Sequence, residues 1–118
     1  MRPLQVLVVE QHDGMRAALR DWLAACSTGL QPQEARSMEE ALALAEDSAL
    51  DLALVNLELP GGNGIEAARA LRSRFPRCRV VVMSVNDSAA LRSAALEAGA
   101  AAFVSKRELP EALGAFLK

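Results

Sequence analysis

Residues 51–64 read DLALVNLELPGGNG, and this stretch decides the fold. Its apolar part, Leu52–Leu57, is typical of a short strand buried on both faces. A Pro/Gly-rich loop follows, and a helical pattern begins after Gly64. In an open α/β sheet, functional side chains lie where strands end at the carboxyl edge. Asn56, at the end of this run, therefore holds the position at which such a fold would place its reactive group.

Apolar runs alternate with helical patterns along the rest of the chain. Strands are predicted over Gln5–Glu10, Leu30–Arg36, Leu50–Leu57, Arg79–Met83 and Ala100–Val104. Helices are predicted over Asp13–Cys26, Met38–Ala45, Gly64 to Phe75, Asp87 or Ser88 to Ala98, and from Pro110 onward. The first has Asp13 as its N-cap and Gly29 as its stop, and the second follows a capping box at Ser37. The fourth is capped by Asp87 or Ser88. This alternation predicts a doubly wound, five-stranded parallel α/β sheet with right-handed crossovers. The predicted strand order is 2-1-3-4-5, which puts the second strand at an edge, where Pro32 is tolerable.

Composition restricts the class of protein. The chain has 118 residues, 52% hydrophobic and 24% charged, which fits one domain over residues 1–118. A net charge of −2 gives no reason to expect nucleic-acid or membrane binding. No apolar run is long enough to cross a bilayer. Cys26 and Cys78 lack metal-ligand spacing, so we expect reduced thiols in a cytoplasmic protein.

Polar side chains at the strand ends form the candidate site. The predicted topology brings together Glu10, Gln11, Asn56, Ser84 and Lys106. No Gly-rich loop follows the first strand, so a nucleotide or flavin phosphate would lack its usual cradle.

The motifs, taken in order, resemble those of the response-regulator receiver domain. VLVVEQH resembles the family's first strand with its acidic pair, and LVNLELPGGNG resembles the acceptor strand and its turn. VVMSV resembles the strand with the switch hydroxyl, and AGAAAFVSK the strand with the switch aromatic and the lysine. The resemblance covers essentially the whole chain and implies a flavodoxin-like, CheY-like fold. The last block and PGGNG look most like receivers that precede a LuxR/NarL-type helix-turn-helix output domain.

The resemblance also implies a role for each site position. In this family an aspartate accepts a phosphoryl group from a histidine kinase, and magnesium lies between it and the acidic pair. Matched by position, the acceptor is Asn56, the acidic pair is Glu10 and Gln11, the switch residues are Ser84 and Phe103, and the phosphate-contacting lysine is Lys106.

Two of these positions depart from the family pattern. An amide is a very poor oxygen nucleophile, so we expect no ordinary acyl phosphate at Asn56. Magnesium prefers charged oxygens, and this chain offers one carboxylate, Glu10, beside the neutral amides of Gln11 and Asn56. We therefore expect no cofactor and weak or lost magnesium binding. A Glu10–Lys106 ion pair is expected instead.

Several residues keep two interpretations. Glu58 is either a solvated loop acid or a replacement ligand, and Asp13 is either the N-cap or a ligand. His12 is expected to be a loop residue rather than a ligand or base. Ser84 could simply bond the backbone, and Phe103 could simply pack. Five arginines cluster along one stretch of the sequence, and this predicts either a solvated face or a surface for an acidic partner. They are Arg69, Arg72, Arg74, Arg77 and Arg79.

The leading functional prediction is a non-enzymatic, atypical receiver that acts through protein–protein contact or homodimerisation. Its interaction face is predicted over Asp87–Ala98, Ala100–Ser105 and Leu109–Lys118. The alternatives are a phosphoacceptor with a divergent magnesium site at Glu10 and Glu58, a small-molecule-sensing receiver, and an adaptor without a ligand. A sensor kinase or a linked output domain would lie outside this chain. DNA binding is not expected of this domain.

Overall fold

Five parallel strands form the centre of the molecule. The computed structural model describes residues 4–26, 32–45, 49–86 and 88–114. The sheet order is β2-β1-β3-β6-β7. The strands are β1 (Val6–Val9), β2 (Gln33–Ala35), β3 (Leu52–Asn56), β6 (Arg79–Ser84) and β7 (Ala102–Ser105). The prediction of a doubly wound sheet with the second strand at an edge is confirmed, and Pro32 directly precedes that strand.

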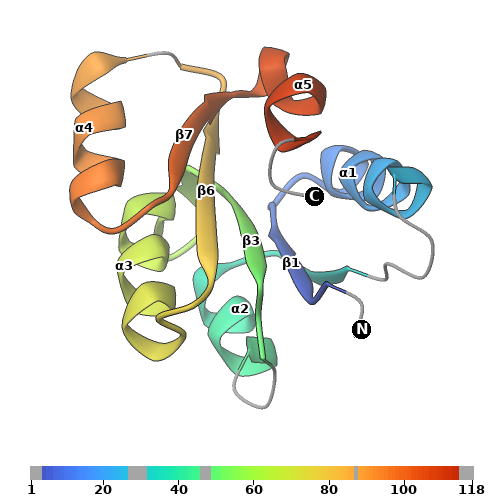
Figure 1. Cartoon of the computed structure of the whole chain (residues 1–118), viewed down its shortest axis with the longest axis horizontal. Helices are drawn as coiled ribbons and strands as arrows, with labels where there is room; N and C mark the ends of the chain where they lie inside the picture. Colours follow the sequence, from blue (N-terminus) through green and yellow to red (C-terminus); the bar gives the residue numbers. More distant parts are fainter. Residues whose placement is uncertain (1–3, 27–31, 46–48, 87, 115–118) are drawn as a thin grey trace.

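Helices cover both faces of this sheet. They are α1 (Asp13–Cys26), α2 (Met38–Ala45), α3 (Gly64–Arg74), α4 (Ala89–Glu97) and α5 (Leu109–Gly114), with a 3-10 turn, η1, over Lys106–Glu108. Figure 1 shows α1 and α5 on one side of the sheet and α2, α3 and α4 on the other. Since the strands are covered on both faces, every residue of β1 and β3 is buried. This explains their continuous apolar runs.

Two hydrophobic cores result from the alternation of side chains along the strands. Leu7 and Val9 of β1 face the core under α2, α3 and α4, whereas Val6 and Val8 face the core under α1 and α5. In β7 the neighbours Phe103 and Val104 divide between the two cores in the same way. A shift of register by one residue would exchange these faces, so burial fixes the register of the sheet.

The stretch after β3 is more ordered than the predicted loop. Glu58–Leu59 (β4) and Gly62–Asn63 (β5) pair as a small antiparallel hairpin. Gly61, at its turn, has a φ of 76°, a left-handed conformation that favours glycine. Asn63 then caps α3, because its Oδ1 accepts hydrogen bonds from the backbone N–H groups of Ile65 and Glu66, both at 2.9 Å. The sequence reading did not identify this cap.

Of the three helix N-caps predicted from the sequence, two are confirmed and one is wrong. Ser37 Oγ accepts a hydrogen bond from the Glu40 N–H at 3.1 Å, as the capping box predicts. Of the two candidates for the cap of α4, Ser88 lies among the described residues and accepts from the Leu91 N–H at 3.3 Å. The N-cap prediction for Asp13 is wrong. Asp13 is the first residue of α1, and its carboxylate pairs with Arg16 at 2.6 Å.

Other boundaries differ by a few residues from the prediction. Helix α5 begins at Leu109 rather than Pro110, since the turn η1 leads directly into it. Cys26, the last residue of α1, is exposed. Leu113 is fully buried against the sheet, so it cannot form part of an outer interaction face. The predictions for Gly29, Leu30 and Asp87, and the part of the predicted interaction face over residues 115–118, fall outside the described residues.

No helix in the described part of the chain is both long enough and apolar enough to cross a membrane.

Candidate functional site

The carboxyl ends of four strands meet at one edge of the sheet. Glu10 follows β1, Asn56 ends β3 and Ser84 ends β6. In the parallel ladders Asn56 lies opposite Met83, and Ser84 lies opposite Ser105, the last residue of β7. Lys106 comes directly after β7. Sheet register, rather than nearness in sequence, therefore places these residues at the same edge.

A buried ion pair joins the two ends of this edge. Lys106 Nζ lies 2.6 Å from Glu10 Oε1, as the sequence analysis expected. The Glu10 side chain is fully buried, and that of Lys106 is 13% exposed. The other carboxylate oxygen, Oε2, accepts a long hydrogen bond of 3.4 Å from the His12 N–H. Because burying an unpaired charge is costly, the lysine compensates a carboxylate that water cannot reach.

Arg16 of α1 supports the strand end on which Glu10 sits. Its Nη1 donates a hydrogen bond of 2.9 Å to the backbone carbonyl of Glu10, and its Nε lies 3.4 Å from Glu34 of β2. The sequence analysis missed this residue, because an arginine on an amphipathic helix is normally read as part of the solvated face.

Asn56 is almost completely buried, with 1% of its surface exposed. Its Nδ2 donates a hydrogen bond of 2.7 Å to the backbone carbonyl of Glu58, which ties the end of β3 to the hairpin. Its Oδ1 has no hydrogen-bond partner among the described residues. An ionised carboxylate has no proton to donate, so an aspartate here could not make the bond to the Glu58 carbonyl. The amide is thus used structurally.

Ser84 and Phe103 are both held by backbone contacts. The buried Ser84 Oγ accepts a hydrogen bond of 3.0 Å from the Asn86 N–H, which matches the simpler of its two interpretations. Phe103 is 3% exposed, and the Arg92 guanidinium of α4 lies 5.4 Å from its ring centroid. Arg92 Nη1 also donates to the Phe103 carbonyl at 2.9 Å. Arg92, which the sequence analysis did not single out, therefore links α4 to β7.

A groove of about 530 Å³ lies beside Asn56, between the β4–β5 hairpin and α4. Its lining is mostly apolar but includes the amide side chains of Gln11 and Asn63. The lining residues are Gln11, Leu57, Glu58, Leu59, Pro60, Gly62, Asn63, Ile65 and Leu91. Gln11 thus lines this groove. The Glu58 side chain is exposed, as its interpretation as a solvated loop acid expected.

With this geometry in place, comparison with known proteins identifies the family. The sequence pattern of the response regulator receiver domain matches residues 6–118. The chain belongs to the response regulator receiver domain family. It is therefore a receiver of the kind used in two-component signalling, and its α/β architecture is the one that this family shares.

Several curated relatives of this receiver are named as transcription regulators. It is 37% identical over 105 residues to the transcriptional activator protein ExaE of Pseudomonas putida, covering 89% of this chain and 49% of that protein. It is also 37% identical over 105 residues to the DNA-binding transcriptional activator DevR/DosR of Mycobacterium tuberculosis, covering 87% and 48%. A relative from Thermotoga maritima, 35% identical, is named a cyclic di-GMP phosphodiesterase, and the match covers 27% of it. The receiver spans about half the length, or less, of the relatives it matches.

Solved structures agree with this assignment. The signal receiver domain of the putative response regulator NarL from Mycobacterium tuberculosis superposes with a TM-score of 0.83 at 28% identity, covering 98% of this chain and 96% of that one. A LuxR-family two-component response regulator from Aurantimonas sp. superposes with a TM-score of 0.81 at 28% identity, covering 98% and 86%.

The residues of this receiver do not fit a magnesium ion of the family's kind. Among the described residues no group of three or more His, Cys, Asp or Glu side chains could hold a metal. The carboxylate of Glu10 is already paired with Lys106. The Asn56 Oδ1 oxygen is neutral, and a hard divalent cation prefers charged oxygens. No step that depends on magnesium is therefore assigned to this site.

Proposed function

We propose that this receiver transmits its signal without ordinary aspartyl phosphorylation, through contacts with other proteins in the cytoplasm. The observation that carries the proposal is the state of the acceptor position. Asn56 offers a neutral amide, and that amide is already used in a hydrogen bond to the Glu58 carbonyl. The lysine that would neutralise a phosphoryl group is instead 2.6 Å from Glu10. The acceptor position thus lacks a carboxylate nucleophile, and the positive charge of Lys106 is already paired with Glu10.

Labelling with radioactive acetyl phosphate in the presence of magnesium tests this proposal. We expect no covalent phosphoryl label on the native chain, because an amide does not attack phosphorus. The Gln11→Asp, Asn56→Asp double variant restores the carboxylates and should take up label. A Glu58→Gln variant is the matched control for the alternative phosphoacceptor site. Label on the native chain that disappears in Glu58→Gln would establish that alternative and contradict the proposal.

The proposed contact surface includes the outer side of α4. Leu96 there is 47% exposed, and with Leu44 and Val85 it is one of three exposed large apolar side chains among the described residues. Receivers of this family interact with kinases and output domains and often dimerise. The relatives named as transcriptional activators continue beyond the matched region, which supports a linked output domain as one such partner.

Sedimentation of the chain at increasing concentration tests whether this surface joins two copies. We expect a monomer–dimer equilibrium that Leu96→Ser shifts toward monomer by about tenfold in the dissociation constant, the effect of losing a buried leucine contact. Leu44→Ser is the matched control, since Leu44 of α2 is 39% exposed and lies outside the proposed surface. A chain that stays monomeric at high concentration, or equal effects of both variants, would rule out dimerisation through α4.

A second candidate function is sensing of a small neutral ligand. The groove of about 530 Å³ beside Asn56 favours it, because its lining is mostly apolar, includes the Gln11 amide and the Glu58 carboxylate, and has the size of a ligand site. Ligand-dependent shifts in melting temperature that Leu91→Ala abolishes would support this candidate over pure protein contact.

A further inference from the structure

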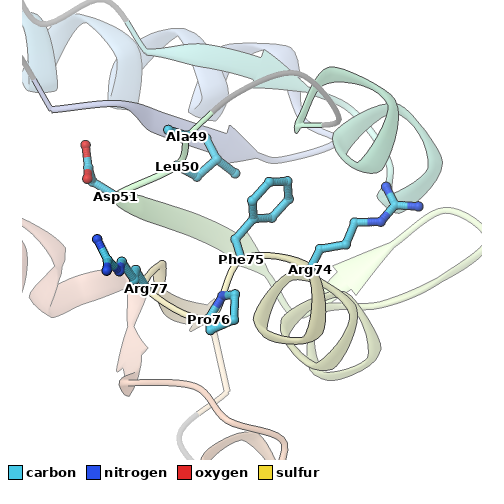
Figure 2. Close-up of a pocket in the computed structure, with 7 residues that line it drawn as sticks. All are labelled: Ala49, Leu50, Asp51, Arg74, Phe75, Pro76 and Arg77. Atoms are coloured by element: carbon cyan, nitrogen blue, oxygen red, sulfur yellow. The ribbon is translucent and has the colours of Figure 1, made fainter.

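A second cavity lies at the opposite edge of the sheet from Asn56. It has a volume of about 370 Å³, at the small end of the range for ligand pockets. Its lining comes from the residues just before β3 and from the end of α3 and the residues that follow it. These residues are Ala49, Leu50, Asp51, Arg74, Phe75, Pro76 and Arg77. Figure 2 shows the Phe75 ring between Leu50 and Arg74, with Asp51 and Arg77 on the same side of the ring as Leu50. The floor is apolar and the rim is charged.

The charges on this rim favour an anion. Arg74 and Arg77 contribute two positive charges and Asp51 one negative charge, so the lining is formally +1. Asp51 has a structural use, because its Oδ2 accepts a hydrogen bond of 2.8 Å from the Gln5 N–H. Arg74 makes one long bond of 3.4 Å to the Leu42 carbonyl, which leaves most of its five N–H groups available. Among the described residues no ion pair involves Arg77.

The apolar floor specifies the rest of the ligand. Phe75 is the C-cap of α3 and is half-buried, and Leu50, which lines the same cavity, is 4% exposed. A flat or compact apolar group would cover the ring, and a carboxylate on that group would reach a guanidinium at the rim. Arginine binds carboxylates through two parallel hydrogen bonds, which gives orientation as well as attraction.

We propose that this cavity, defined by Leu50, Phe75, Arg74 and Arg77, binds a small aromatic monocarboxylate. The site is independent of the proposed function and of the Asn56 edge. It adjoins the amino end of β3, the strand whose other end carries Asn56. A ligand here would bridge the start of β3 to the end of α3 and stabilise the folded domain.

A chemical-shift titration of the full chain with sodium benzoate tests the proposal, with benzamide as the neutral probe of the same shape. We expect saturable shifts at the amides of Leu50, Asp51, Phe75 and Arg77. Benzoate should bind about tenfold more tightly than benzamide, the effect of one charge-assisted contact. Arg77→Gln and Arg74→Gln should each reduce this preference.

Arg69→Gln is the matched control, since Arg69 is an exposed arginine of the same helix that does not line the cavity. It removes the same charge and should leave benzoate binding unchanged. Equal losses in all three variants would mean a general charge effect and would overturn the proposal. So would equal binding of benzamide, the absence of saturable shifts, or shifts centred on Lys106 and Asn56, which would place the anion at the other edge.

Discussion

Replacing Lys106 with methionine is expected to lower the free energy of unfolding by about 3–5 kcal/mol, the cost of leaving one partner of a buried ion pair uncompensated. Glu10 is fully buried, and among the described residues the other donor to its carboxylate is the His12 N–H at a long 3.4 Å. Methionine keeps most of the volume of lysine but removes its charge. Chemical denaturation of the native chain and the variant measures the difference.

The double variant Glu10→Gln, Lys106→Met separates charge from packing. Because it removes both charges, it should recover most of the stability lost in Lys106→Met. If Lys106→Met costs less than about 1 kcal/mol, the value typical of an exposed pair, then the Glu10–Lys106 contact does not compensate a buried charge.

Replacing Gly64 with alanine is the second substitution with a large expected effect. A Cβ at this position would lie 2.5 Å from the carbonyl oxygen of Asn56 and 2.9 Å from the Cα of Leu57. Both atoms are backbone, so neither can turn aside, and the strand end must shift. Overpacking of this kind costs about 1–3 kcal/mol and sometimes more. The Gly64 N–H also donates to the Leu57 carbonyl at 2.7 Å, and the shift would strain that bond.

Gly14 provides the matched control for Gly64. It also lies in the first turn of a helix, but a Cβ there would meet nothing within 4 Å. Gly14→Ala should therefore stabilise the domain by about 0.4–1 kcal/mol through lost freedom of the unfolded chain. Thermal or denaturant unfolding of both variants is sufficient. Equal effects of the two substitutions would show that the close approach of α3 to the end of β3 is not important for stability.

Much of the fold could be predicted because the strong signals are local. The continuous apolar run of β3 and the serines before α2 and α4 each predict an element from a few neighbouring residues. The Glu10–Lys106 pair could also be predicted, although it joins distant parts of the chain. Parallel strand order brings the ends of β1 and β7 to one edge, and charge balance then requires the contact.

The features that were missed depend on tertiary contacts. Asn63 lies in a Pro/Gly-rich stretch that reads as loop, and its capping role follows from the turn of the β4–β5 hairpin. Arg92 reads as one more charge on a solvated helix, and only the packing of α4 on β7 brings it to Phe103. The arginines of α3 and of the segment after it were treated as one cluster, but they divide in the structure. Arg72 donates to the Cys78 carbonyl at 3.1 Å and closes the helix end, whereas Arg74 and Arg77 border the second cavity.

Calorimetric titration with magnesium and beryllofluoride, a phosphoryl-group analogue, tests the central claim most directly. It compares the native chain with the Gln11→Asp, Asn56→Asp variant under identical conditions. The account predicts no heat of binding for the native chain, because the single carboxylate is paired with Lys106, and measurable binding by the variant. Binding of both ligands by the native chain would contradict the account and would return this receiver to control by a phosphorylation-like switch.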